Sequence, residues 1–209
     1  WSRGLGDVYK RQGINYELIN GKVHWDENLG KMQPLFYKAV AYNKISAFIE
    51  PPPVEDLEGN AAETSMLKVV WFNNVESRDL ALTLFVSRWM FAWWAMYGDD
   101  NHVTQENLLS FPIDFGNIAS SERKSLLILA KNLHKQMTQN VKWKKNAGLK
   151  IGSWDLSSSK DLLQEIDAVW AKILGLSSFL SELQFQYFST VKTSLEADED
   201  EVELPDLEI

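Results

Sequence analysis

The feature that most constrains this chain is an apolar run, LALTLFVSRWMFAWWAMY, which covers Leu80–Tyr97. Its length is close to that of a membrane-spanning helix. However, Ser87 and Arg88 stand at its middle, where a charge is most costly in a bilayer. We therefore predict a buried helix over residues 78–97, capped by Ser77 and covered by neighbouring elements on nearly all sides.

The segments before this run have the residue types of strands. Asn20-Gly21 separates two short alternating runs, and this dipeptide favours a type I′ turn, so we predict a hairpin over residues 15–25. Both residues 35–49 and residues 66–72 are rich in β-branched and aromatic side chains. This composition predicts one or two strands within 35–49 and another strand over 66–72. The three prolines within residues 51–60 predict a loop between them.

The segments after the run are mostly helical in period. A stripe that includes Leu126 and Leu133 predicts a helix over 121–141, and a second stripe predicts one that begins at Ser159 and ends at Gly175. The remaining predictions are a turn-rich connector over 98–115 with a short helix at 104–109, a loop over 143–154, and a last helix over 177–193.

Because the predicted strands come first and the helices follow, the sequence predicts the α+β class. We expect N-terminal antiparallel strands and hairpins over residues 13–76, followed by a C-terminal cluster of about four helices over 77–194 in the same domain.

The two ends of the chain differ from this body. Residues Ser2–Gln12, SRGLGDVYKRQ, match a translated transposase sequencing adapter residue for residue, so we expect residues 1–12 to be an artefact and the natural chain to be truncated there. Residues 195–209 hold eight acids and no base, which predicts a disordered tail, either solubilising or partner-binding. Between the two ends, 18 bases face 20 acids, so the body is nearly neutral.

The chain carries few groups for catalysis. It has no cysteine, which excludes disulfides and thiolate metal sites and is compatible with a cytoplasmic protein. Its three histidines, His24, His102 and His134, lie far apart on different predicted elements, so we expect no metal site. No nucleophile elbow, P-loop or dinucleotide glycine motif is present, and we predict that this chain alone is not an enzyme.

Two segments resemble a known family. In residues 87–113, an aromatic helix with Phe91 and Trp93 is followed by the turn DDNHVT, Asp99–Thr104, and by Phe111-Pro112. In residues 162–188, Ile166-Asp167 is followed by a leucine-glycine-leucine-serine stretch and a final helical pattern. In this order and spacing they resemble the C-terminal region of type IIG and related adenine-specific DNA methyltransferases of restriction-modification systems. The chain departs from the family pattern at Asp100, where glycine is usual, and in lacking the tyrosine-aspartate-x-x-tyrosine ending.

The resemblance implies a target-recognition region that binds double-stranded DNA. In this family an N-terminal catalytic domain binds S-adenosylmethionine and carries an asparagine-proline-proline-aromatic motif that holds a flipped-out adenine. Neither that motif nor a cofactor motif occurs here, so we expect the catalytic domain to be missing and this fragment to bind no cofactor.

Three segments are candidates for DNA contact. The eight bases between Arg123 and Trp154, with no acid among them, could hold phosphates, with Lys142, Trp143, Lys144 and Lys145 on a loop; the alternative is an ordinary solvated surface. Residues in the strand segment could enter a groove or could simply alternate on a sheet. The turn after the aromatic helix could orient the domain on DNA or could cap two helices. The strand and turn candidates are Tyr37, Lys38, Tyr42, Lys44, Asn101, His102 and Thr104.

A function of another class is also compatible with the sequence. The apolar helix and the acidic tail could belong to a non-enzymatic adaptor that binds a protein partner. The nearly neutral body favours this alternative, because DNA-binding modules are usually basic.

Overall fold

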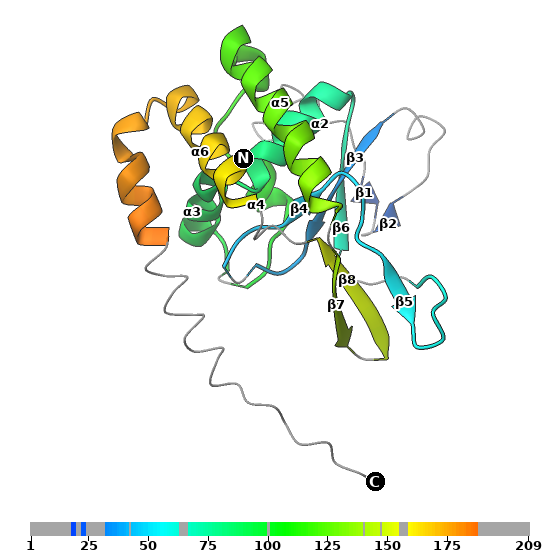
Figure 1. The fold of residues 1–209 in the computed structure, drawn as a ribbon. Helices are drawn as coiled ribbons and strands as arrows, with labels where there is room; N and C mark the ends of the chain where they lie inside the picture. The colour runs from blue at the N-terminus through cyan, green and yellow to red at the C-terminus, as the bar shows by residue number, and fades with distance from the viewer. Residues whose placement is uncertain are drawn as a thin grey trace.

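The computed structural model describes residues 18–19, 22–23, 32–41, 43–62, 67–99, 101–139, 141–146, 148–154 and 159–187. Both the adapter-like residues 1–12 and the acidic residues 195–209 lie outside these ranges. Within them, antiparallel strands and a group of helices form an α+β fold, which confirms the predicted class (Figure 1).

The strands form three antiparallel sheets with the orders β1-β2, β4-β3-β6 and β5-β8-β7. Their bounds are β1 Leu18–Ile19, β2 Lys22–Val23, β3 Gln33–Lys38, β4 Ala47–Phe48, β5 Val54–Asp56, β6 Leu67–Phe72, β7 Val141–Asn146 and β8 Leu149–Trp154. The pairing of Leu18 with Val23 confirms the antiparallel pairing expected within residues 15–25, although its turn lies outside the described residues. In the central sheet, β3 pairs with β6 along its whole length.

The helices are α2 Val75–Phe85, α3 Arg88–Tyr97, α4 Gln105–Leu109, α5 Ser120–Met137 and α6 Lys160–Ile173, with short 3-10 turns η2 Phe115–Asn117 and η4 Ser177–Phe179. Residues 180–187 are also helical, and the rest of the predicted last helix lies outside the described residues. Helix α6 ends at Ile173, and Gly175, the predicted terminating glycine, follows its C-cap with a φ of 71°. Ser159 occupies the predicted cap position but makes no side-chain capping hydrogen bond.

The single helix predicted over residues 78–97 is wrong, because it is two helices. Helix α2 is capped by Asn74, whose side chain accepts a hydrogen bond from the Ser77 amide, so Ser77 is not the cap. The chain then breaks at Ser87, which is extended and accepts a hydrogen bond from the Met90 amide, so that it caps α3. A serine side chain satisfies an amide at a helix start, which favours this break within an otherwise continuous apolar run.

Two segments predicted as loops contain strands. Within residues 51–60, β5 forms three residues after the proline run begins. Residues 143–154 belong almost entirely to the β7–β8 hairpin, and β8 pairs with both β7 and β5. The C-terminal part of the chain, predicted to be helical, therefore also contains a β-hairpin. This hairpin joins β5 in a sheet that extends away from the helices (Figure 1).

The charge inside the apolar run is paired within the protein. The guanidinium of Arg88 lies 2.7 Å from the Asp167 carboxylate, and the Arg88 amide donates to the same carboxylate at 2.9 Å. The Trp89 indole donates to the Asp167 carbonyl at 3.0 Å. The Asp167 side chain is 1% exposed, so this pair joins the start of α3 to α6 inside the core. A carboxylate at the start of a helix is also stabilised by the helix dipole.

Tyr187 extends this network to the strands. The Arg88 guanidinium lies 5.1 Å from the centre of the Tyr187 ring, a cation–π distance. The Tyr187 hydroxyl donates to the Asn43 carbonyl at 2.6 Å. The last described helical segment is therefore tied to the loop between β3 and β4.

The pH dependence of stability tests the burial of Asp167. Burial raises the pKa of this carboxyl from 3.8 to about 6, although the hydrogen bonds and charge of Arg88 oppose the shift. The folded protein therefore holds this proton more tightly than the unfolded chain does. The contribution of Asp167 to the free energy of unfolding is greatest below about pH 4, where the carboxyl is protonated in both states, and it falls as the pH rises through about 6.

We therefore expect the free energy of unfolding of the wild type, minus that of Asp167→Asn, to fall by about 3 kcal/mol as the pH rises from about 4 to about 7. Urea unfolding at several pH values measures this difference. Asp161→Asn, on the exposed side of α6, controls for the removal of one carboxylate from the same helix. A difference that stays constant with pH would contradict the raised pKa of Asp167.

Candidate nucleic-acid interface

The turn after α3 is held by hydrogen bonds within the protein. The Asp99 carboxylate accepts from the amides of Asn101 and His102, at 3.1 and 2.6 Å, and lies 3.0 Å from the His102 ring. These contacts lower the pKa of Asp99, the His102 amide contributing most. The turn is also joined to the β3–β4 loop, because the Ala41 amide donates to the Asn101 carbonyl.

The three candidates in this turn therefore have structural roles. The Asn101 and His102 backbones hold the turn, and the His102 carbonyl accepts from the Trp94 indole. Thr104 caps α4 in a capping box with Asn107. The turn therefore caps a helix, which is the alternative to a turn that orients the domain on DNA. The His102 side chain is nonetheless 59% exposed.

The candidates from 142 to 145 lie on a strand, so their predicted loop is wrong. Side chains alternate along β7, and residues directly opposite each other in an antiparallel pair share a face. Lys142 lies opposite Ser153 and Lys144 opposite Ile151, which places these lysines on one face. The other face carries Trp143, which is 48% exposed, and Lys145.

A close approach to β5 fixes the position of this hairpin. Trp143 lies opposite Gly152, whose amide donates to the Pro53 carbonyl at 2.8 Å. A Cβ atom on Gly152 would stand 2.6 Å from that carbonyl oxygen, so a larger residue would push the strands apart. At the hairpin turn, Gly148 has a φ of 79°, which glycine adopts without a steric cost.

Lys38 joins the hairpin to the central sheet. Its Nζ donates to the Ser153 hydroxyl at 2.8 Å, so the face of Lys142 and Lys144 is the face turned toward β3. Burial lowers the pKa of Lys38, and the charges of Lys44 and Lys144 lower it further. Lys44, from the same part of the sequence, and Lys144, about a hundred residues later, are therefore both within electrostatic reach of Lys38. We call Lys38, Lys44, Lys142 and Lys144 the basic cluster.

Of the two remaining strand candidates, Tyr37 does not join this cluster. Tyr37 is 3% exposed and belongs to the hydrophobic core, which leaves it almost no surface to present to a DNA groove. Tyr42 lies outside the described residues.

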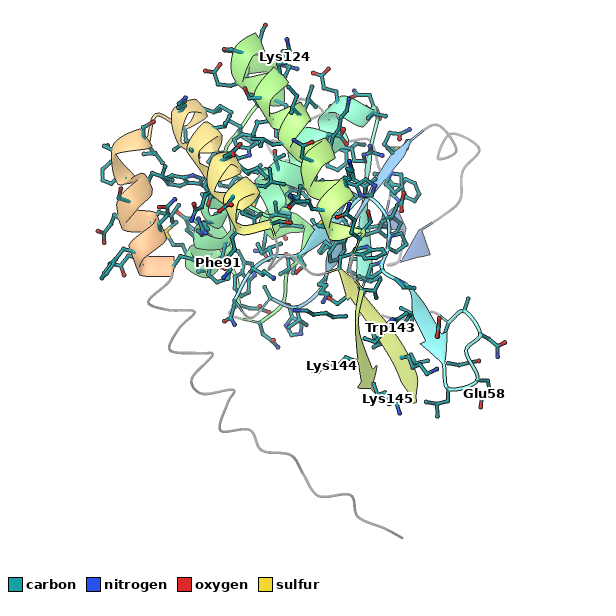
Figure 2. All side chains as sticks on the ribbon, viewed as in Figure 1. Glu58, Phe91, Lys124, Trp143, Lys144 and Lys145 are labelled. Atoms are coloured by element: carbon teal, nitrogen blue, oxygen red, sulfur yellow. The ribbon has the colours of Figure 1, made fainter. Side chains whose placement is uncertain are left out.

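The basic segment from Arg123 to Trp154 does not form one surface. Arg123 is used internally: its guanidinium donates to the Phe115 carbonyl at 2.6 Å and pairs with Glu76. Lys124 lies at the end of the molecule opposite to Lys144 and Lys145 (Figure 2). Lys150 lies 4.0 Å from Glu55 on β5. The basic side chains that are neighbours in the sequence of this segment therefore lie on several different surfaces of the protein.

The described residues contain no group of three or more histidine or acidic side chains placed to hold a metal ion. In the same ranges, no helix combines the length and apolarity needed to cross a membrane. Comparisons of the chain with protein-family models, with curated proteins and with solved structures find no match.

Substitution of Thr104 separates a structural turn from a DNA-contacting one. We expect Thr104→Ala to lower the free energy of unfolding by about 1 kcal/mol, because it removes the α4 cap, whereas Thr104→Ser should retain the cap. Chemical denaturation measures both variants. A variant that kept its stability but lost affinity for duplex DNA would assign Thr104 to the interface instead.

Proposed function

We propose that this chain is the DNA-recognition portion of a site-specific adenine-N6 DNA methyltransferase of a restriction-modification system, acting in the cytoplasm. Catalysis and the S-adenosylmethionine cofactor belong in this proposal to a catalytic domain elsewhere in the parent protein. The chain contributes affinity for double-stranded DNA and the choice of site.

The observation that carries the proposal is the basic cluster. Lys38 and Lys44 come from β3 and the loop after it, while Lys142 and Lys144 come from a hairpin about a hundred residues later. Burial lowers the pKa of Lys38 most, and the charges of Lys44 and Lys144 lower it further, so these cations are close enough to act on one anionic strand together. A phosphate backbone that binds at these lysines would release its own counterions, which favours binding.

Trp143 lies on the face of the β7–β8 hairpin opposite to Lys142 and Lys144. It is about half exposed, and it lies between lysines that can hold phosphates. An exposed indole on a strand can contact bases or sugars while the neighbouring cations fix the register on the backbone. The adaptor alternative receives less support, because residues 80–90 of the apolar run are all buried within this chain.

The test reverses charge on the cluster face of β7. We expect Lys142→Glu/Lys144→Glu to weaken binding to duplexes of unrelated sequence about equally, because phosphate contacts carry no sequence information. The slope of log affinity against log salt should fall by about 2, near 0.9 for each lost phosphate contact. Fluorescence anisotropy over a salt series measures both quantities.

The matched control is Lys124→Glu/Lys131→Glu, which changes charge equally on the exposed surface of α5. This control should keep most of the wild-type affinity. An equal loss in both variants would show that only net charge matters, and an unchanged affinity of the β7 variant at low salt would remove the basic cluster from the interface.

A further inference from the structure

The outer face of the β5-β8-β7 sheet carries an exposed tryptophan. The inner face is identified by Val54 of β5, which is buried, and by Ser153 of β8, which accepts a hydrogen bond from Lys38. Because side chains alternate along a strand, Trp143, opposite Gly152, points to the other side of the sheet. A solvated sheet face normally carries polar side chains, whereas Trp143 leaves 48% of its surface in solvent there.

The surface beside this indole is flat and apolar. Gly152, directly across the strand pair, has no side chain, and the exposed ring of Pro53 lies next to it. A Cβ atom on Gly152 would stand 3.0 Å from the Pro53 Cγ and 3.1 Å from its Cδ. Trp143 makes no hydrogen bond or ring contact with any other residue that the structure describes. One face of the indole is therefore open to a planar ligand.

The charge around Trp143 is positive. The sequence from Arg123 to Trp154 holds eight bases and no acid. Lys145 stands on the same face as Trp143, lies closer to the tip of the hairpin, and is exposed (Figure 2). Across the strand pair, Lys150 lies 4.0 Å from Glu55, whereas Lys145 forms no ion pair within the described part of the chain. An open aromatic ring beside such a cation matches a ligand of planar rings joined by anionic groups.

We propose that this face binds single-stranded DNA, with a base stacked on Trp143 and the adjoining phosphate at Lys145. An unpaired base offers its ring face to an indole, whereas a base within a duplex exposes only its edges in the grooves. Proteins distinguish RNA from DNA through the ribose 2′-hydroxyl. Neither Gly152 nor Pro53 has a side-chain group for that hydroxyl, so these neighbours of the indole give RNA no advantage.

This site differs from the basic cluster. Lys142 and Lys144 lie on the inner face of the hairpin, and they were assigned to the phosphates of a duplex. Trp143 and Lys145 lie on the outer face, where they meet an unpaired strand. The inference therefore goes beyond the proposed function and does not depend on it.

The unmodified full chain tests the proposal without any substitution. Fluorescence anisotropy compares labelled strands of about 12 nucleotides: oligodeoxyuridine, an abasic strand with the same phosphates, and oligouridine. We expect the abasic strand to bind at least about fivefold more weakly than oligodeoxyuridine, because it keeps the phosphates and lacks the stacking bases. Equal affinity for these two strands would overturn the proposal, and tighter binding of oligouridine would overturn the assignment to DNA.

Substitutions then locate the site. Trp143→Ala should weaken the binding of oligodeoxyuridine at least about fivefold and leave the binding of the abasic strand nearly unchanged, whereas Trp143→Phe, which keeps a ring, should retain most of the affinity. Lys145→Gln should lower the slope of log affinity against log salt by about 0.7. The matched control is Phe179→Ala, which removes an aromatic side chain that is 59% exposed on η4. An equal loss in this control, or an equal loss of Trp143→Ala for both strands, would contradict stacking on Trp143.

The outcomes separate this inference from the proposed function. Binding of oligodeoxyuridine through Trp143 by a chain that binds no duplex would support the single-strand site and contradict the proposed function. Duplex binding that depends on Lys142 and Lys144, without any binding of the single strand, would do the reverse. Phosphatidylglycerol vesicles are the remaining probe, since exposed tryptophan and lysine also suit an anionic lipid surface. Vesicle binding that Trp143→Ala abolishes, with no oligonucleotide binding, would overturn the proposal.

Discussion

The buried ion pair between Arg88 and Asp167 is the interaction on which the helical part of this fold depends. Removing two charges from water is costly, and their attraction offsets that cost only when the remaining hydrogen-bonding groups are also satisfied. Here the carboxylate receives both the guanidinium and the backbone amide of Arg88. Because either partner alone would be an uncompensated buried charge, the pair specifies how α3 meets α6.

Other polar side chains also determine how this long apolar run folds within the chain. The chain breaks at Ser87, so the run forms two helices, α2 and α3, instead of one. Trp170, on the same helix as Asp167, donates its indole hydrogen to Thr83 of α2. Polar side chains embedded in the apolar run thus align all three helices.

The helices could largely be predicted from the sequence, since a periodic stripe such as Leu126 and Leu133 is a local signal and both residues are buried in α5. The break at Ser87 has no such signal, because apolar residues continue on both sides of it. The β7–β8 hairpin also has no clear signal, because lysines occupy both faces of β7 and hide the alternation of a strand. The cluster itself depends on β3 and β8 meeting through Lys38 and Ser153, 115 residues apart, and no local pattern encodes that contact.

The hydrogen bond from Tyr187 to Asn43 joins residues 144 positions apart. Closing so long a loop has an entropic cost that local contacts do not have, so contacts of this kind form late in folding. During synthesis from the N-terminus, the loop that carries Lys44 has no such tether until the last helix has left the ribosome. This loop is consequently tied down only when almost the whole chain has been made.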